Sequence, residues 1–272
     1  MPDVAVATAV PLGTLVLFGG GDDDPLLARL AGLLPQREAA IEVLTTATEY
    51  HPDRTAAAYA QAWRQAGCTR VGHLKVDETH SADAPATLAR LRAAALVFIS
   101  GGDQERLTTF LLGTEFLALL LEKYRTEPGF IVAGTSAGAA ALAEVMLVDG
   151  HGWRSLLGGR IEARPGLGLL PGVVLDQHFA ERARYPRLLH AVLAHPHLLG
   201  LGLSEETGLV VRQGHLATVF GDEVVFVVDA AHLTHNNLPG LPHRAPISGH
   251  GLHLHLLVAG QPLDLDPREV RG

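Results

Sequence analysis

The stretch Phe130-Ile131-Val132-Ala133-Gly134-Thr135-Ser136-Ala137-Gly138-Ala139-Ala140-Ala141-Leu142-Ala143 decides the fold. Its apolar first part has the composition of a buried parallel strand, and its alanine-rich second part favours a helix. The glycines between them permit a sharp turn and close packing of the neighbouring elements. The stretch therefore predicts a strand, a tight turn and a helix at the carboxyl edge of a parallel sheet.

The centre of this stretch, Gly134-Thr135-Ser136-Ala137-Gly138, matches the Gly-x-Ser-x-Gly pattern of a nucleophile elbow. Such a turn exposes the serine oxygen at the sheet edge, beside the positive end of a helix. The amide of Ala137 then points at any oxyanion formed there. An ordinary strand, turn and helix with Ser136 as N-cap shows the same pattern, so both interpretations stay open here.

Length and composition allow one large domain or two small ones. The chain has 272 residues, of which 47% are hydrophobic and 18% charged, and we expect a single α/β domain over 1–272 with residues 1–13 as an N-terminal tail. The net charge of -8 gives no basic face for nucleic acid. A single cysteine, Cys68, excludes an intrachain disulfide and favours a reducing compartment. With no signal peptide and no apolar run long enough for a membrane span, we expect a cytoplasmic protein.

Strands and helices alternate in the first half of the chain. Apolar runs predict strands at 14–18, 41–45, 70–74 and 95–99, and helical patterns predict helices at 53–65 and 84–93. This alternation indicates a parallel sheet with helices on both faces, in which ligands bind off the carboxyl edge. The turns after Phe18, Ile99 and Ala133 all lie on that edge.

Two of these turns are rich in glycine. Gly19-Gly20-Gly21 precedes three aspartates, which would repel a phosphate, and the spacing is not that of a dinucleotide-binding turn. We therefore favour a tight turn followed by an acidic helix N-terminus over a nucleotide site. Gly101-Gly102 either brings a backbone amide to the site or forms a plain turn.

A serine nucleophile needs a base, and the base needs an orienting acid. The chain has fifteen histidines, so position must select among them. His178 follows the apolar run Val173–Leu175, and Glu205 follows Leu199–Leu203, so both are expected on the carboxyl edge with Ser136. The predicted triad is Ser136, His178 and Glu205.

One alternative uses the chain order of α/β-hydrolases, with the acid between serine and histidine. The acid would then be Asp176 or Glu205, and the histidine would lie within 232–243. That region follows no parallel-type strand, which makes this assignment the weaker one. His253 and His255 share a face of the last strand, but no third ligand accompanies them, so we expect no metal site.

Arginines follow the predicted base. Arg182, Arg184 and Arg187 lie near the start of a helix expected after Phe179. Guanidinium groups bind carboxylates with two hydrogen bonds, so the cluster suggests a substrate that carries a carboxylate. Spacings of two and three do not place all three on one helix face.

At these residues the chain resembles the cyanophycinase branch of the S51 serine peptidase family. The matching segments are Ser100-Gly101-Gly102-Asp103-Gln104, Gly134-Thr135-Ser136-Ala137-Gly138-Ala139, Asp176-Gln177-His178-Phe179 with the three arginines, and Gly200-Leu201-Gly202-Leu203-Ser204-Glu205-Glu206-Thr207. The tail from Gly251 to Leu257 resembles the family's closing strand. The resemblance covers about residues 14–265, with the motifs in family order.

The resemblance implies a flavodoxin-like three-layer α/β/α sandwich, similar to class I glutamine amidotransferases. Its central sheet is mainly parallel, with a C-terminal antiparallel extension. It implies Ser136 as nucleophile, His178 as base, Glu205 as acid, and Gly102 and Ala137 as oxyanion donors. The residues that it places in the substrate pocket are Gln104, Asp176, Gln177, Arg182, Arg184 and Arg187.

The implied reaction is hydrolysis of cyanophycin, an arginine-bearing polyaspartate, to β-aspartyl-arginine dipeptides, by a homodimer without a cofactor. The chain departs from the family pattern at Ala133, Ser204, Glu206 and Gly208. Two other functions therefore stay open. One is an aspartyl dipeptidase of the same family, and the other is a non-catalytic nucleotide-binding or sensory module.

Overall fold

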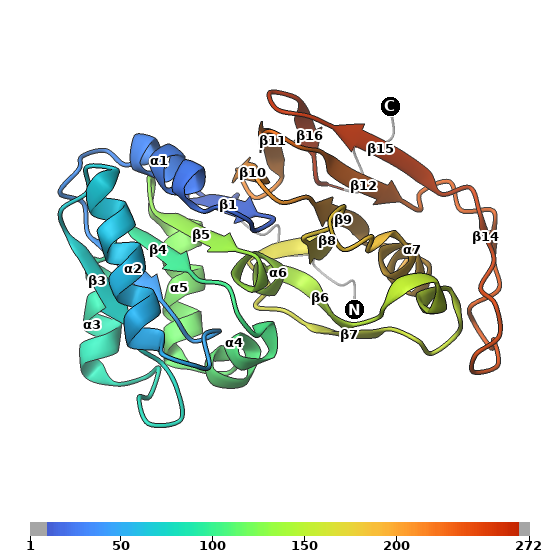
Figure 1. Ribbon diagram of the computed structural model, residues 1–272, viewed down its shortest axis with the longest axis horizontal. Helices are drawn as coiled ribbons and strands as arrows, with labels where there is room; N and C mark the ends of the chain where they lie inside the picture. Colours follow the sequence, from blue (N-terminus) through green and yellow to red (C-terminus); the bar gives the residue numbers. More distant parts are fainter. Residues whose placement is uncertain (1–9, 267–272) are drawn as a thin grey trace, which may run out of the picture.

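The computed structural model describes residues 10–266 (Figure 1). Its helices are α1 Asp24–Leu33, α2 Pro52–Gln65, α3 Pro85–Ala93, α4 Gln104–Leu111, α5 Glu115–Thr126, α6 Ala137–Leu142 and α7 Tyr185–Ala194, with a 3-10 helix η1 at Gly152–Leu156. The strands of the first half are β1 Thr14–Phe18, β2 Ile41–Leu44, β3 Val71–Leu74, β4 Leu96–Ile99, β5 Ile131–Thr135, β6 Ala143–Asp149, β7 Glu162–Pro165 and β8 Leu170–Gln177. The remaining strands are β9 Leu199–Leu203, β10 Thr207–Arg212, β11 Leu216–Gly221, β12 Val225–Asp229, β13 His235–Asn236, β14 Gly249–His250, β15 His253–Leu257 and β16 Pro262–Asp264.

Two large sheets carry the fold. The first has the order β16-β11-β10-β1-β5-β4-β2-β3, in which β1, β5, β4, β2 and β3 are parallel and the others antiparallel. The second has the order β15-β12-β9-β8-β6-β7, with β6, β8 and β9 parallel. The expected fold class is confirmed: mainly parallel strands in a mixed α/β fold, with an antiparallel C-terminal extension.

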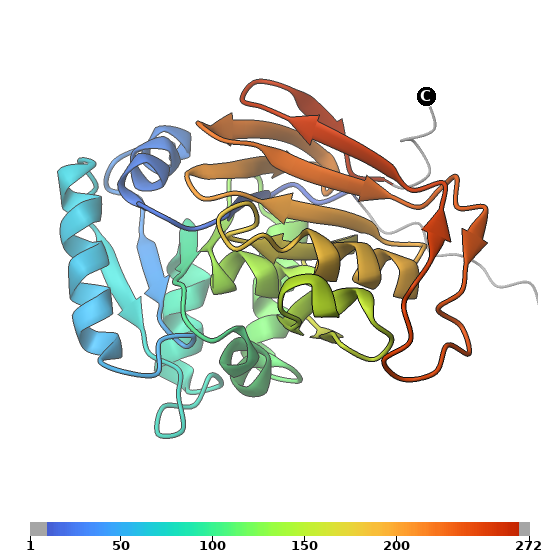
Figure 2. The ribbon, with the colours of Figure 1, turned by 45° about the vertical axis from the view of Figure 1, so that its right-hand side comes forward.

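Buried side chains divide between the faces of the sheets. Alternate residues of β1, such as Val16 and Phe18, pack against α1 and α2. Their neighbours Leu15 and Leu17 face the larger core, which includes α3, α4, α5 and the inner face of the second sheet. Helix α7 covers the outer face of the second sheet, and Figure 2 shows it beside β8 and β9. The alternation follows from the two-residue repeat of a strand.

Local sequence signals explain where the helices begin. Pro52 and Pro85 stand at the first turns of α2 and α3, where a missing N–H costs no hydrogen bond. Asp103 caps α4 by accepting a hydrogen bond from Glu105 N at 2.8 Å. This cap fixes the loop that follows β4, and that loop belongs to the candidate site.

The structure departs from the sequence expectations in three places. Strands β8 and β9, which precede His178 and Glu205, lie in the second sheet rather than beside β5. Helix α7 begins only at Tyr185, so Arg182 and Arg184 precede it instead of lying on it. Residues 1–9 of the expected tail lie outside the described residues, whereas Gly13 N already donates to Tyr124 O at 2.9 Å and extends the packed fold.

Candidate active site

Ser136 occupies a strained turn between β5 and α6. Its backbone angles are φ 51° and ψ -117°, a combination that costs a non-glycine residue about 1–3 kcal/mol. Ser136 N donates to Phe18 O at 2.9 Å, and Ser136 O accepts from the amides of Ala139 and Ala140. The glycines of the motif allow this packing, because an added Cβ at Gly134 would lie 2.5 Å from the Gly138 carbonyl. The geometry is that of a nucleophile elbow rather than of a relaxed N-cap.

A continuous hydrogen-bonded chain runs from the serine to a carboxylate. Ser136 Oγ lies 2.7 Å from His178 Nε2, and His178 Nδ1 lies 2.5 Å from Glu205 Oε1. The Glu205 carboxylate can only accept, so Nδ1 carries the proton and Nε2 accepts from the serine hydroxyl. The three predicted residues are brought together in the predicted order.

Burial controls the charge of the histidine. It lowers the pKa of His178, the hydrogen bond that His178 donates to Glu205 opposes this shift, and the nearby Arg182 charge lowers that pKa further. The neutral imidazole, which can take a proton from Ser136, therefore persists to a lower pH than in a free histidine. The side chain of His178 is 12% exposed and that of Glu205 is 36% exposed, so solvent reaches the acid more readily than the base.

The glycine pair after β4 lies next to Ser136. Gly101 lies against Ser136, because an added Cβ there would stand 3.4 Å from Ser136 Cβ. Gly102 has φ +141°, and a Cβ on it would meet Ala47 O at 2.1 Å, so only glycine fits this turn. In the described part of the chain, no loop or cap hydrogen bond occupies the amides of Gly102 and Ala137. Both amides therefore keep a hydrogen-bond donor that no other loop or cap group uses.

A buried polar network lies behind His178. Asp176 is 1% exposed and forms two hydrogen bonds with Arg187, Nε to Oδ2 at 2.6 Å and Nη2 to Oδ1 at 2.5 Å. Arg184 Nη1 donates to Asp176 Oδ1, to the backbone oxygen of Gln177 and to its side-chain Oε1. Burial lowers the pKa of Arg184 to about 10. The carboxylate partner of Arg187 is thus a residue of its own chain.

The other predicted pocket residues differ in exposure. Gln104 is buried, donating from Nε2 to Leu147 O at 2.7 Å, and it joins the network because its Oε1 accepts from Gln177 Nε2 at 3.5 Å. Arg182 is exposed, and no ion pair among residues 10–266 includes it. Among the three arginines, Arg182 is the one free to meet a substrate carboxylate.

The glycine turn after β1 contributes more than the sequence suggested. His178 N donates to Gly19 O at 2.9 Å, and an added Cβ on Gly20 would lie 2.3 Å from His178 Cε1. Glu206 N donates to Gly20 O at 3.0 Å. This turn therefore supports the base and the acid loop. The signal available in the sequence was three glycines at the carboxyl end of a strand on the catalytic edge.

Two departures from the family pattern find local explanations. Ser204 is 1% exposed, and its hydroxyl donates to Val224 O at 2.8 Å. Glu206 Oε1 accepts from Asp22 N at 2.5 Å. Both side chains hold the loop that carries Glu205, and neither is turned toward Ser136 Oγ by a hydrogen bond.

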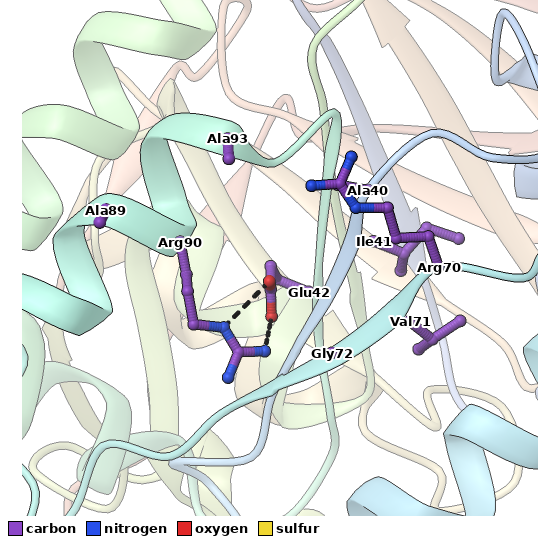
Figure 3. A pocket seen from close by; sticks show the side chains of 9 residues that line it. All are labelled: Ala40, Ile41, Glu42, Arg70, Val71, Gly72, Ala89, Arg90 and Ala93. Atoms are coloured by element: carbon purple, nitrogen blue, oxygen red, sulfur yellow. Dashed lines mark hydrogen bonds and ion pairs between the residues drawn. The ribbon is translucent and has the colours of Figure 1, made fainter.

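A separate pocket lies at the opposite edge of the first sheet, where β2 and β3 begin (Figure 3). It has a volume of about 300 Å³. Glu42 and Arg90 point toward one another and form an ion pair, and the guanidinium group of Arg70 lies apart from them. The opposite charges of Glu42 and Arg90 cancel, and the pocket lies at the amino ends of β2 and β3, away from the carboxyl ends of the strands.

Residues 10–266 contain no group of three histidine, cysteine, aspartate or glutamate side chains that could hold a metal ion. Over the same residues, no helix is both long and apolar enough to cross a membrane.

Comparison with known proteins places this geometry in context. The model of a family described as "Peptidase family S51" matches residues 15–219. Cyanophycinase from Trichormus variabilis (strain ATCC 29413 / PCC 7937) is 33% identical over 262 residues, which cover 94% of this chain and 87% of the relative. Cyanophycinase from Synechococcus elongatus is 33% identical over 263 residues, covering 95% and 81% of the two chains.

Solved structures share the fold. A peptidase from an acI-B1 Actinobacterium superposes with a TM-score of 0.67 at 23% identity, covering 94% of this chain and 98% of the other. A Listeria monocytogenes EGD-e protein assigned as peptidase E gives a TM-score of 0.54 at 14% identity, covering 78% and 99%. These similarities agree with the class I glutamine amidotransferase-like fold expected from the sequence.

Proposed function

Because the chain belongs to peptidase family S51 and is therefore a serine peptidase, we propose that it hydrolyses cyanophycin to β-aspartyl-arginine dipeptides through Ser136, His178 and Glu205. The observation that carries the proposal is the unbroken hydrogen-bonded chain from Ser136 Oγ through His178 to Glu205, at a strained elbow. The substrate assignment is supported by 33% identity to proteins named cyanophycinase over most of both chains.

In the proposed mechanism, Ser136 Oγ attacks a backbone carbonyl of the aspartate chain while its proton moves to His178 Nε2. The amides of Gly102 and Ala137 hold the oxyanion. When the carbon–nitrogen bond breaks, the imidazolium returns the proton to the departing amine. Water, deprotonated by His178, then cleaves the acyl-enzyme and releases a carboxylic acid, and Ser136 regains its proton.

Glu205 holds the Nδ1–H tautomer of His178 and stabilises the imidazolium that forms. Arg182 is proposed to bind a substrate carboxylate, since it is exposed and lies close enough to His178 to influence its pKa. Asp176, Arg184, Arg187, Gln104 and Gln177 are proposed to shape the pocket wall through their mutual hydrogen bonds.

Both charges of such a substrate have counterparts close to the triad. Arg182 offers a cation on one side, and the exposed Asp22 and Asp24 follow the turn that contacts His178. Between α1 and α2 a pocket of about 530 Å³ is lined by Asp23, Asp24, Tyr50, Arg54, Tyr59 and neighbouring residues. The exposed carboxylate of Asp24 at its rim suits a guanidinium group of an arginine-bearing polymer.

The test incubates purified protein with insoluble cyanophycin and follows soluble dipeptide by mass spectrometry, with Ser136→Ala as the control. Release of β-aspartyl-arginine by the wild type alone supports the reaction, the substrate and the nucleophile together. Cleavage of α- or β-aspartyl dipeptides without polymer degradation would replace the proposal with an aspartyl dipeptidase. No labelling of Ser136 by a serine-directed phosphonate, together with a nucleotide-induced thermal shift, would favour a binding module.

A homodimer and a cytoplasmic location stay predictions of the sequence. Size-exclusion chromatography with light scattering tests the first, and fractionation of the producing cells tests the second.

A further inference from the structure

A partly buried carboxylate lies next to the elbow but outside the triad. Asp23 Oδ1 accepts a hydrogen bond from Thr135 Oγ1 at 2.6 Å, and Asp23 Oδ2 accepts one from Tyr59 OH at 2.5 Å. Burial raises the pKa of Asp23, and these two hydrogen bonds oppose the rise. No ion pair among residues 10–266 includes Asp23. A carboxylate in such a place is costly to bury, and its two hydroxyl partners are what stabilise it.

One of those partners directly precedes the serine. Thr135 ends β5, and the strained backbone of Ser136 begins at the next residue. The backbone hydrogen bonds of Ser136 fix its amide and carbonyl to Phe18, Ala139 and Ala140. The Thr135–Asp23 hydrogen bond adds a side-chain restraint immediately before the strained residue, where a rotation of the peptide would redirect Ser136 Oγ.

The same turn also restrains the base. Asp23 closes the segment that begins at Gly19, whose carbonyl accepts from His178 N and whose next residue, Gly20, packs on the imidazole ring. The segment is therefore bonded to the nucleophile's strand at one end and to the base at the other. Tyr59 ties Asp23 to α2, which adds a third point of attachment.

We propose that Asp23 is a positioning residue: through Thr135 it sets the orientation of Ser136 Oγ toward His178 Nε2, with the Gly19–Asp22 turn as the common support. It touches neither substrate nor the reacting atoms and acts through Thr135. This role is distinct from that of Glu205, which contacts the imidazole directly. The inference rests on the proposed function only in taking Ser136 as the nucleophile.

Two removal variants test the role, Thr135→Val and Asp23→Ala. Because a displacement of about 1 Å at a reacting group costs about a hundredfold in rate, each variant should lower kcat per active site by roughly tenfold to a hundredfold, with KM within about twofold of the wild type. Thr135→Ser keeps the hydroxyl and should restore kcat to within about threefold. Glu38→Ala, which removes an exposed carboxylate just before β2, at the amino edge of the first sheet, is the control and should leave kcat unchanged.

Active-site titration with a serine-directed phosphonate separates a loss of folded protein from a loss of activity in each folded molecule. Normalising kcat to titrated sites removes any loss of folded protein, and Thr135→Val keeps the test valid if Asp23→Ala fails to fold. The double variant should lose no more kcat than the worse single variant, because both changes break the same Thr135–Asp23 hydrogen bond. Per-site kcat unchanged in both single variants, or additive losses in the double variant, would overturn the proposal.

Phosphonate labelling also separates the proposed role of Asp23 from the proposed hydrolysis of cyanophycin, because the labelling reaction does not depend on cyanophycin. A wild type that is never labelled would refute the nucleophilic serine itself, and the inference with it. A labelled wild type, with Thr135→Val labelled at the same rate and turning over equally fast, would refute only the role of Asp23.

Discussion

Replacing Glu205 with glutamine removes the charge beside His178 and keeps a side chain of the same size. His178 Nδ1 and Glu205 Oε1 are 2.5 Å apart, so the charges of imidazolium and carboxylate are centred about 4 Å from each other. At that separation the attraction is about 4 kcal/mol at an effective dielectric constant of 20, and about 1 kcal/mol in water. The side chain of Glu205 is 36% exposed, which places the effective value between these limits.

A loss of about 2.7 kcal/mol in transition-state stabilisation corresponds to about a hundredfold lower kcat for Glu205→Gln. KM should stay within about twofold, because Glu205 contacts the histidine and not the substrate. The assay is steady-state release of soluble dipeptide, normalised by phosphonate titration. Ser136→Ala should lose all turnover, so the acid variant should be clearly the more active of the two.

Glu38→Gln is the matched control, since it makes the same change at an exposed carboxylate just before β2, at the amino edge of the first sheet. It should leave kcat unchanged. A Glu205→Gln enzyme within about threefold of the wild type would refute the orienting role of Glu205. A loss as complete as that of Ser136→Ala would also contradict the reasoning, because an orienting charge supplies only part of the rate.

Three further changes probe the surroundings of the triad. Arg182→Gln removes a positive charge that lowers the His178 pKa, so that pKa should rise and the acid limb of the pH profile of kcat/KM should move to higher pH. An acid limb that stays in place or moves to lower pH would contradict the role of His178 as the base. Gly102→Ala brings a Cβ within 2.1 Å of Ala47 O, so the loop must shift; kcat per titrated site should fall by about a hundredfold and the melting temperature should fall as well, and normal turnover per site would argue against the Gly102 amide as a donor. Asp176→Ala leaves Arg187 buried without its carboxylate and should lower the free energy of unfolding by about 3–5 kcal/mol in urea titrations; a change below about 1 kcal/mol would show that the pair is not structural.

Much of the first sheet could be predicted because its strands are short, apolar and separated by clear turns. β1 and β9 have the predicted bounds, Thr14–Phe18 and Leu199–Leu203. The position of Ser136, His178 and Glu205 at the carboxyl ends of strands also followed from the parallel pattern, because Ser136 and His178 directly follow buried strands and Glu205 is the second residue after one. Position after a strand is a local signal, and a single sequence contains it.

Membership of a particular sheet is not a local property. Val173–Leu175 and Leu199–Leu203 read as buried parallel strands, and both runs lie in parallel strands, but their parallel partners are each other and β6, and β9 also pairs with β12. Nothing in an apolar run of that length states which strand lies next to it. The predicted helical position of the arginines was wrong for a different reason. Pro186 lies in the first turn of α7, so the helix starts at Tyr185 and Arg182 lies in the preceding turn.

The glycine turn was undervalued because its role depends on tertiary contacts. Gly20 is required because the His178 ring occupies the space of a side chain, and that ring arrives from a residue 158 positions later in the chain. Asp23 likewise reads as one of three acidic residues at a helix N-terminus. Only its contacts with Thr135 and Tyr59 separate it from its neighbours.

The division of the strands between two sheets has a consequence for how the enzyme can fail. Ser136 follows β5 of the first sheet, His178 follows β8 of the second, and Glu205 lies in the segment where the chain crosses from one sheet to the other. Neither half holds a complete triad. A slight separation of the halves, with every strand and helix preserved, would part the serine oxygen from the imidazole. Under the proposed mechanism, catalytic activity therefore depends on how closely the two halves are docked.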